Sequence, residues 1–208
     1  MARRSRWILT TLALSFLATP ALGQACIGTP LSLEQLMVGI GVSFPEGAKG
    51  FGINLGRKMS DHLVLGAEFT ILDTGGIFDP GNYGRTMGAS MGFEAPIQPT
   101  ATGLEITVCP TINPAYEVWG DYNRLVVPFG LGTGITFPLA GGAMKLTPWV
   151  IPQVVRIRES VPTFSVTDSG IAVTGGANLI VKDYFGGLRF SKESDVRVLF
   201  RIQAGMIF

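Results

Sequence analysis

The feature that most constrains the fold is a period-two alternation of apolar residues, which recurs from Leu36 to the end of the chain. In the segment LMVGIGVSF every second residue from Leu36 onward is apolar, and the positions between carry Met, Gly and Ser. Successive side chains of a β-strand point to opposite faces of the sheet, so this pattern predicts strands with one apolar face. No helical periodicity of useful length follows the amino-terminal segment. The sequence therefore predicts an all-β fold.

The alternating segments predict about ten strands, most of them near the 9–11 residues that a tilted membrane-spanning strand needs. Eight strands is the alternative, if the two weakest segments do not span. Short turns are expected near 59–61 and 138–142, and long connections at 72–83, 113–123 and 158–170. Membrane barrels of bacteria alternate short periplasmic turns with longer outer loops, and an even strand count leaves both ends of the sheet in the periplasm.

Composition indicates which face meets lipid. Hydrophobic residues make up 47% of the 208 residues and charged residues only 15%, yet no apolar run beyond the amino terminus is long enough for a spanning helix. The positions between the apolar ones are rich in Gly, Ser and Thr, which suits a crowded, partly wet interior. Since hydrocarbon offers no partner for a free sheet edge, the prediction is a closed antiparallel transmembrane β-barrel whose last strand pairs with the first, near 36–44. A secreted soluble β-barrel that binds a small apolar ligand is the rival.

The amino terminus has the three parts of a secretory signal. Basic residues lie at its start, an apolar stretch covers 7–19, and small residues precede Gln24. Residues 1–23 are therefore predicted to be a cleaved signal peptide, residues 24–35 an amino-terminal periplasmic or lumen-facing segment, and residues 36–208 the barrel.

Export bears on the two cysteines of the chain, Cys26 and Cys109. An exported protein enters an oxidising compartment, where these two can form one disulfide. Two separate thiols are the alternative. The favoured disulfide would tie the segment before the barrel to a mid-chain strand.

The chain ends on an alternating apolar series whose members are Phe200, Ile202, Ala204, Met206 and Phe208. With the signal sequence and the dyad repeat, this ending makes residues 30–208 resemble the small outer-membrane β-barrels of Gram-negative-type bacteria, the group that includes the OmpA transmembrane domain and the OmpX and OmpW families. The resemblance implies a location in the cell outer membrane, and it implies that the terminal series is the signal read by the barrel-assembly machinery. No internal motif selects one family.

Charged residues at inward positions of the predicted strands are the first candidate site. These lumen charges are Glu68, Glu94, Glu105, Arg124, Arg189, Arg197 and Arg201, with Lys58 and Lys145 beside them. Charges in a low-dielectric enclosure must be paired or hydrated. The favoured interpretation is a polar plug of Glu–Arg pairs that holds the barrel shut. A narrow ion path lined by the same groups is the alternative.

Aromatic residues gather around two of the predicted outer connections. They are Phe78, Tyr83, Tyr116, Trp119 and Tyr122. Aromatic girdles anchor barrels at the two membrane interfaces, and this is the favoured interpretation. A recognition surface for a small ligand or a surface partner is the sharper alternative.

Several function classes have no support in the sequence. A net charge of +1 gives no electrostatic footprint for nucleic acid. The only histidine, His62, lies in a predicted periplasmic turn, so no enzyme activity, metal or cofactor is expected, and replacing His62 would test an outer-leaflet enzyme. The sequence thus predicts a monomeric integral barrel in contact with outer-membrane lipid, with a structural or surface-binding role. A narrow pore for ions or small hydrophobic compounds is the first alternative.

Overall fold

The computed structural model describes residues 35–45, 48–73, 83–97, 104–193 and 199–208. The predicted signal peptide and residues 24–34 lie outside this part. The elements are β1 (Leu36–Phe44), β2 (Lys49–Lys58), β3 (Leu63–Asp73), β4 (Tyr83–Phe93), β5 (Ala95–Ile97), β6 (Glu105–Ile112), β7 (Ala115–Trp119), β8 (Tyr122–Leu139), η1 (Ala140–Gly142), β9 (Met144–Val161), β10 (Phe164–Val181), β11 (Tyr184–Glu193) and β12 (Leu199–Ile207). Within the described ranges no helix is long and apolar enough to cross a membrane.

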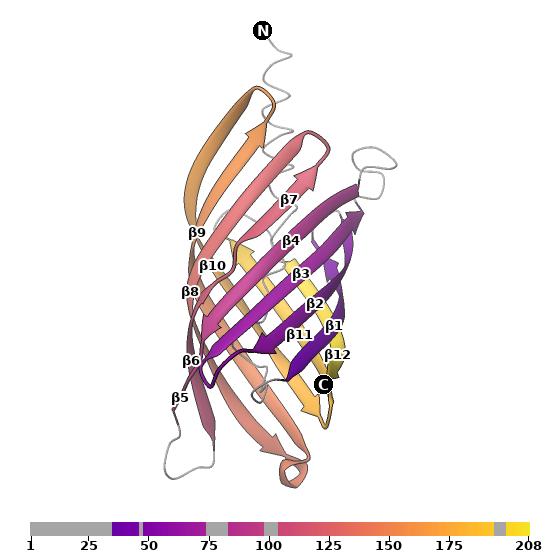
Figure 1. Cartoon of the computed structure of the whole chain (residues 1–208), viewed down its shortest axis with the longest axis vertical. Helices are drawn as coiled ribbons and strands as arrows, with labels where there is room; N and C mark the ends of the chain where they lie inside the picture. Colours follow the sequence, from indigo (N-terminus) through magenta and orange to yellow (C-terminus); the bar gives the residue numbers. More distant parts are fainter. Residues whose placement is uncertain (1–34, 46–47, 74–82, 98–103, 194–198) are drawn as a thin grey trace.

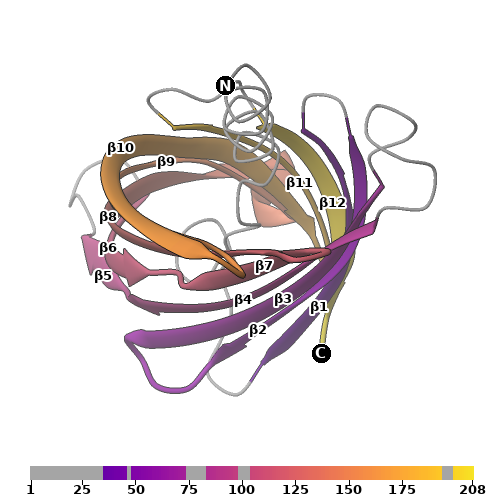
Figure 2. The ribbon, with the colours of Figure 1, turned by 90° about the horizontal axis from the view of Figure 1, so that it is seen from above.

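The strands form one antiparallel sheet that closes into a barrel with ten positions (Figures 1 and 2). Strands β6 and β7 share one position, because both pair with β4 on one side and with β8 on the other. The chain is interrupted between them at Asn113 and Pro114, as expected where proline lacks the N–H of a regular ladder. Strand β5 pairs with the free edge of β6 and lies outside the ring. The prediction of about ten strands is confirmed, and the alternative of eight is wrong.

The seam between β1 and β12 closes the barrel. Their register runs from Met37 opposite Ile207 to Phe44 opposite Phe200. At its end the Leu36 N–H donates to the Phe208 carbonyl at 3.0 Å, and the Phe208 N–H donates to the Leu36 carbonyl at 2.9 Å. The predicted pairing of the last strand with the first is confirmed, so the ring has no unpaired edge at this point, as a sheet in hydrocarbon requires.

Apolar side chains cover the outside of the barrel. On β2, Phe51, Ile53 and Leu55 are 54%, 47% and 42% exposed, whereas Gly52 and Asn54 between them are buried. The same division holds on β1, β4 and β12. A water-soluble barrel has the reverse arrangement, with its apolar side chains inside. The exterior is therefore a surface for lipid contact.

A charge placed on this exterior should be costly at mid-membrane depth. Ile53 lies in the middle of β2, so we expect Ile53→Arg to lower the free energy of unfolding in lipid vesicles by about 2–4 kcal/mol. Met59 in the β2–β3 turn is the matched control, since it is 51% exposed outside the strands and Met59→Arg should change stability by about 0.5 kcal/mol or less. Equal effects of the two variants in urea titrations would contradict a lipid-facing β2.

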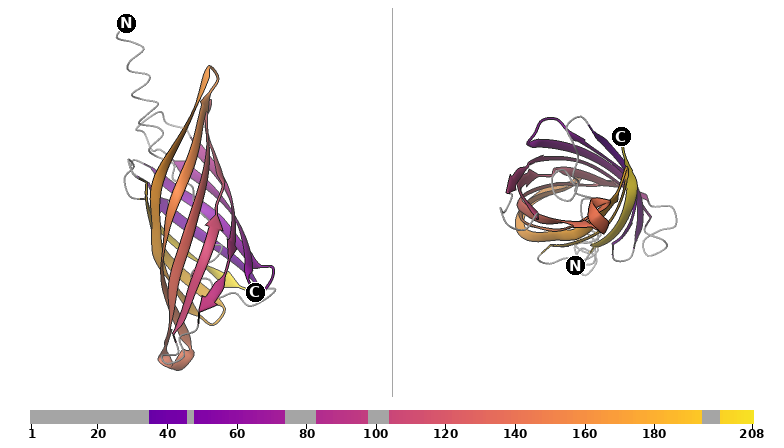
Figure 3. Two further views of the ribbon diagram at one scale, coloured as in Figure 1. Left: turned by 90° about the vertical axis from the view of Figure 1, so that its left-hand side faces the viewer. Right: turned by 90° about the horizontal axis from the view of Figure 1, so that it is seen from below.

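Two predicted long connections turn out to be strand. Residues 113–123 hold β7 and the start of β8, joined by a turn in which Gly120 has φ +55°, and residues 158–170 hold the ends of β9 and β10. The register of β9 and β10 is continuous from Val161 opposite Phe164 to Met144 opposite Val181. Residues 162–169 are exposed on both faces of this hairpin, and polar side chains on both faces hide a strand from a periodicity test. The hairpin projects beyond the ring (Figure 3).

Candidate functional site in the barrel lumen

The inward faces of the strands carry three groups of paired charges. We name them the Arg124 cluster (Arg124, Glu117, Glu159 and Glu193), the middle pair (Glu68 and Arg201) and the end pair (Lys58 and Glu94).

The Arg124 cluster lies at the end of the barrel that carries the β9–β10 hairpin. The Arg124 guanidinium is 3.6 Å from a carboxylate oxygen of Glu117, 3.5 Å from one of Glu159 and 3.3 Å from one of Glu193. Glu117 and Glu159 stand directly opposite Arg124 on β7 and β9. Glu193 is on β11, so its contact spans the lumen past β9 and β10. One buried guanidinium therefore joins four strands.

The middle pair joins β3 and β12 across β1 and β2. Glu68 and Arg201 are 7% and 1% exposed and form an ion pair, and the Thr70 hydroxyl donates to the same Glu68 carboxylate at 3.1 Å. Gly41 makes room for the guanidinium, because a Cβ there would lie 2.6 Å from Nε of Arg201. Arg189, also buried, stands opposite Arg201 in the β11–β12 register.

The end pair lies at the opposite end of the barrel, beside the β2–β3 turn. Lys58 Nζ is 3.0 Å from the Glu94 carboxylate, with side chains 17% and 11% exposed. Burial raises the pKa of the Glu94 carboxyl above its usual range, and the Lys58 ammonium opposes that shift. His62 lies here too: its Nδ1 is 2.9 Å from the Glu94 carbonyl, and its ring stacks on Phe93 at a centroid distance of 5.2 Å. These contacts give His62 a structural role in the turn.

Uncharged groups fill the lumen between the ion pairs. The Thr174 hydroxyl donates to Gln153 Oε1 at 3.2 Å and lies 3.2 Å from the Ser191 hydroxyl, so β9, β10 and β11 are linked in series. Apolar clusters pack inward as well: one holds Cys109, Trp149 and Ile151, another Met37, Ile180, Phe185 and Ile207, and a third Leu72, Trp119 and Tyr122. The interior is thus filled by a mixture of paired charges, hydrogen-bonded groups and apolar side chains.

The aromatic residues that were predicted to lie in outer loops have different places in the structure. Trp119 and Tyr122 are only 9% and 7% exposed and pack against Leu72 inside the barrel, so their predicted place in an outer loop is wrong. Gly84 makes the space for the indole, since a Cβ there would lie 2.5 Å from its atoms. Tyr83 and Tyr116 are 58% and 40% exposed, on β4 and β7. Phe78 lies outside the described residues.

The predicted lumen charges divide in a similar way. Glu68, Glu94, Arg124, Arg189 and Arg201 are buried in the interior. Glu105 is only half-buried, on β6 beside the extra strand β5. Lys145 shares the inward side of β9 with Thr147, but it lies at the start of the strand and is exposed, so it is not buried with the other lumen charges. Arg197 lies outside the described residues. Within the described ranges no group of three His, Cys, Asp or Glu side chains could hold a metal ion.

Sequence reasoning missed the three glutamates of the Arg124 cluster. Glu117 and Glu159 lie in the segments 113–123 and 158–170 that were expected to be connections, and Glu193, on β11, was not among the predicted lumen charges. The alternation of Ala115, Glu117 and Trp119 was the available signal, since all three are buried on one face of β7.

Two further predictions concern the cysteines and the terminal series. Cys109 is fully buried, whereas Cys26 lies outside the described residues, so the disulfide stays a prediction. The terminal series Phe200, Ile202, Ala204, Met206 and Phe208 lies on the exposed face of the last strand and the residue after it. Its recognition by the assembly machinery stays a prediction too.

A closed antiparallel sheet with an apolar exterior and a polar, ion-paired interior is the architecture of outer-membrane β-barrel proteins, and the chain has this architecture. No family model matches the sequence, and no curated protein sequence matches it either.

Three of the solved structures with a similar course of the chain come from bacteria. The amino-terminal β-barrel domain of Pseudomonas aeruginosa OprF is 9% identical, with a TM-score of 0.37 over 86% of this chain and 100% of its own. The attachment invasion locus protein Ail of Yersinia pestis is 12% identical, with a TM-score of 0.25 over 84% and 95%. The translocator domain of the autotransporter NalP from Neisseria meningitidis is 9% identical, with a TM-score of 0.40 over 84% and 87%. Likeness at this level says nothing about ligands or roles.

Proposed function

We propose that this protein is an integral outer-membrane barrel whose lumen is plugged by ion pairs, and that it has a structural or surface-binding role. The observation that supports the plug is that charged side chains meet across the lumen from strands that are not neighbours. Arg201 of β12 reaches Glu68 of β3, and Arg124 of β8 reaches Glu193 of β11.

The burial of these groups favours a plug over an ion path. When the side-chain atoms alone are counted, Glu68 and Arg201 are 3% and 2% exposed. By the same measure Arg124 and Glu117 are 3% and 0% exposed. Charges that line an aqueous path keep water or a passing ion beside them. Charged groups that have lost their hydration water must instead form ion pairs with each other. Each such pair then links two strands across the lumen.

Conductance in planar lipid bilayers tests the plug. We expect the wild-type protein to give no stable current steps. The double variant Glu68→Ala/Arg201→Ala removes two large side chains from the middle of the lumen and should give small, reproducible steps if the variant remains folded, which heat-dependent gel mobility reports. Lys58→Ala, which shortens a side chain at the rim, is the matched control and should stay silent. Reproducible wild-type steps that change size in Glu68→Gln would support the narrow pore instead.

The β9–β10 hairpin supports the surface-binding part of the proposal. It extends beyond the ring (Figure 1), and Phe164 and Val166 near its tip are 56% and 50% exposed. An extended two-stranded ribbon with exposed apolar groups is a suitable contact surface for a partner. The proposal includes no catalytic step, since His62 is engaged in the turn at the opposite end.

Two partner assignments complete the proposal. The barrel is proposed to be a monomer that contacts outer-membrane lipid over its whole apolar exterior. The outward series on β12 is proposed to be recognised by the barrel-assembly machinery before the seam with β1 forms. The exposure of that series on the outer face supports the second assignment.

A further inference from the structure

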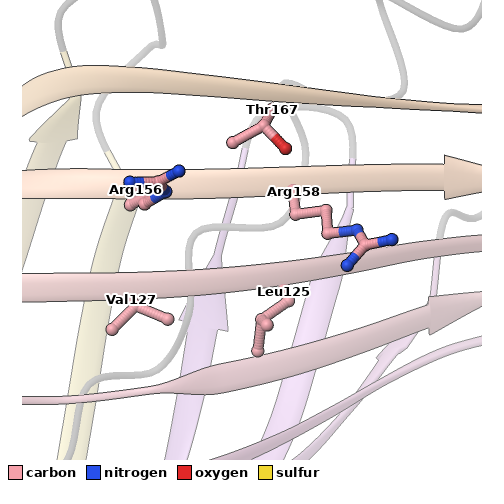
Figure 4. Close-up of a pocket in the computed structure, with 5 residues that line it drawn as sticks. All are labelled: Leu125, Val127, Arg156, Arg158 and Thr167. Atoms are coloured by element: carbon pink, nitrogen blue, oxygen red, sulfur yellow. The ribbon is translucent and has the colours of Figure 1, made fainter.

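An external groove of about 220 Å³ lies across β8, β9 and β10, near the end of the barrel that carries the β9–β10 hairpin. It is lined by Leu125, Val127, Arg156, Arg158 and Thr167. Figure 4 shows the two arginines of β9 between the apolar side chains of β8 and the threonine of β10. The groove is on the outer face, because the residues that alternate with the arginines, such as Val155, are buried inside.

The arginines of this groove lack an internal counter-ion. In the register, Arg156 stands opposite Val127 and Ser169, and Arg158 opposite Leu125 and Thr167. None of these neighbours is acidic, and within the described ranges neither arginine forms an ion pair. Two residues on one face of a strand are about 7 Å apart, so the guanidiniums repel each other unless an anion lies between or above them.

Their position along β9 matches the boundary of the lipid-facing band. The outward residues of β9 from Met144 to Val154 contain no charged group. Ten residues at about 3.3 Å each, tilted by about 40°, span roughly 25 Å, which is the height of the apolar band of such barrels. Arg156 is the next outward residue. The pair therefore lies where the headgroups of one leaflet begin.

We infer that this groove binds the phosphate of an anionic membrane lipid. Arginine forks bind phosphate oxygens with two parallel N–H donors, and the Thr167 hydroxyl lies where it can add a third. Leu125 and Val127 continue the apolar outer face of β8 from Phe129 to the level of the arginines, so the acyl chains of the same lipid can lie along β8. This inference rests on the proposed location in a membrane and adds a specific lipid site to it.

Lipid retention in nonionic detergent tests the inference. Native mass spectrometry of the folded full chain is carried out with added phosphatidylglycerol, with phosphatidylcholine and with inorganic phosphate. We expect the wild type to retain phosphatidylglycerol in preference to phosphatidylcholine. Arg156→Gln/Arg158→Gln should weaken phosphatidylglycerol binding about 30-fold, roughly fivefold for each arginine near an anionic headgroup. The matched control is Arg85→Gln, which removes another exposed outward arginine, on β4, and should bind like the wild type.

Two results would overturn the inference. One is a double variant that retains phosphatidylglycerol as tightly as the wild type does. The other is inorganic phosphate that binds as tightly as phosphatidylglycerol and displaces it, which would define a site for a free anion. Heat-dependent gel mobility of each variant reports barrel folding separately, so a failure of the lipid site is distinguishable from a failure of the proposed membrane barrel.

Discussion

Arg124→Met should lower the free energy of unfolding by about 3–5 kcal/mol, because it removes the only cation in contact with three carboxylates within the described part of the lumen. Methionine keeps most of the volume, so the loss reports the charge and not a cavity. The carboxylate of Glu117 would be left fully buried without its partner. Urea titration of the barrel in lipid vesicles, followed by tryptophan fluorescence, measures the change.

Two variants serve as controls for this prediction. Arg124→Lys keeps the charge and should recover part of the loss. Glu159→Gln should cost about 1 kcal/mol or less, since the Glu159 side chain is 29% exposed and its pair with Arg124 is screened by water. If Arg124→Met and Glu159→Gln proved equally mild, the cluster would be a hydrated group of charges and not a structural crosslink.

A double-mutant cycle on the middle pair should give a large coupling energy. We expect Glu68→Leu and Arg201→Met each to cost about 3–5 kcal/mol, because each leaves a buried charge without its counter-ion. The double variant replaces the pair by apolar groups of similar size, so its loss should be far smaller than the sum of the two single losses. Unfolding titrations of all four proteins provide the measurement.

The end pair is the matched comparison for this cycle. Lys58→Met should cost about 1 kcal/mol or less, because both side chains of the end pair remain partly exposed to water. Losses that simply add in the Glu68 and Arg201 cycle would contradict a dry ion pair in the middle of the lumen.

Much of the fold follows from the alternation itself. On β1 the predicted apolar face, which begins at Leu36, is the outer face. There one face meets lipid and the other meets a crowded interior, and the two environments select different residue types. The closure of β1 on β12 also follows, from the requirement that a sheet in lipid has no edge. The prediction failed where that contrast is lost, at the β9–β10 hairpin, whose two faces both meet water.

The lumen was harder to predict than the exterior. Parity along a strand shows which side chains point inward, so Glu68, Arg124 and Arg201 could be named. Partner choice depends instead on shear, the stagger between strands, which brings Arg201 to Glu68 over 133 positions of sequence. Trp149 and Ile151 point inward on β9 although both are apolar, because part of this lumen is packed with apolar groups. No local pattern in the sequence indicates which part of the lumen is packed with apolar side chains.

The β1–β12 seam has a consequence for biogenesis. Strands β1 and β12 are neighbours in the closed barrel but are separated by more than a hundred positions along the chain, so their pairing has to close a long loop. Until β1 pairs with β12, the backbone N–H and C=O groups along one edge of β1 have no hydrogen-bond partner in the sheet. Because hydrocarbon does not tolerate an open sheet edge, insertion of the barrel is coupled to the pairing of β1 with β12, and a factor that covers this edge of β1 would assist insertion.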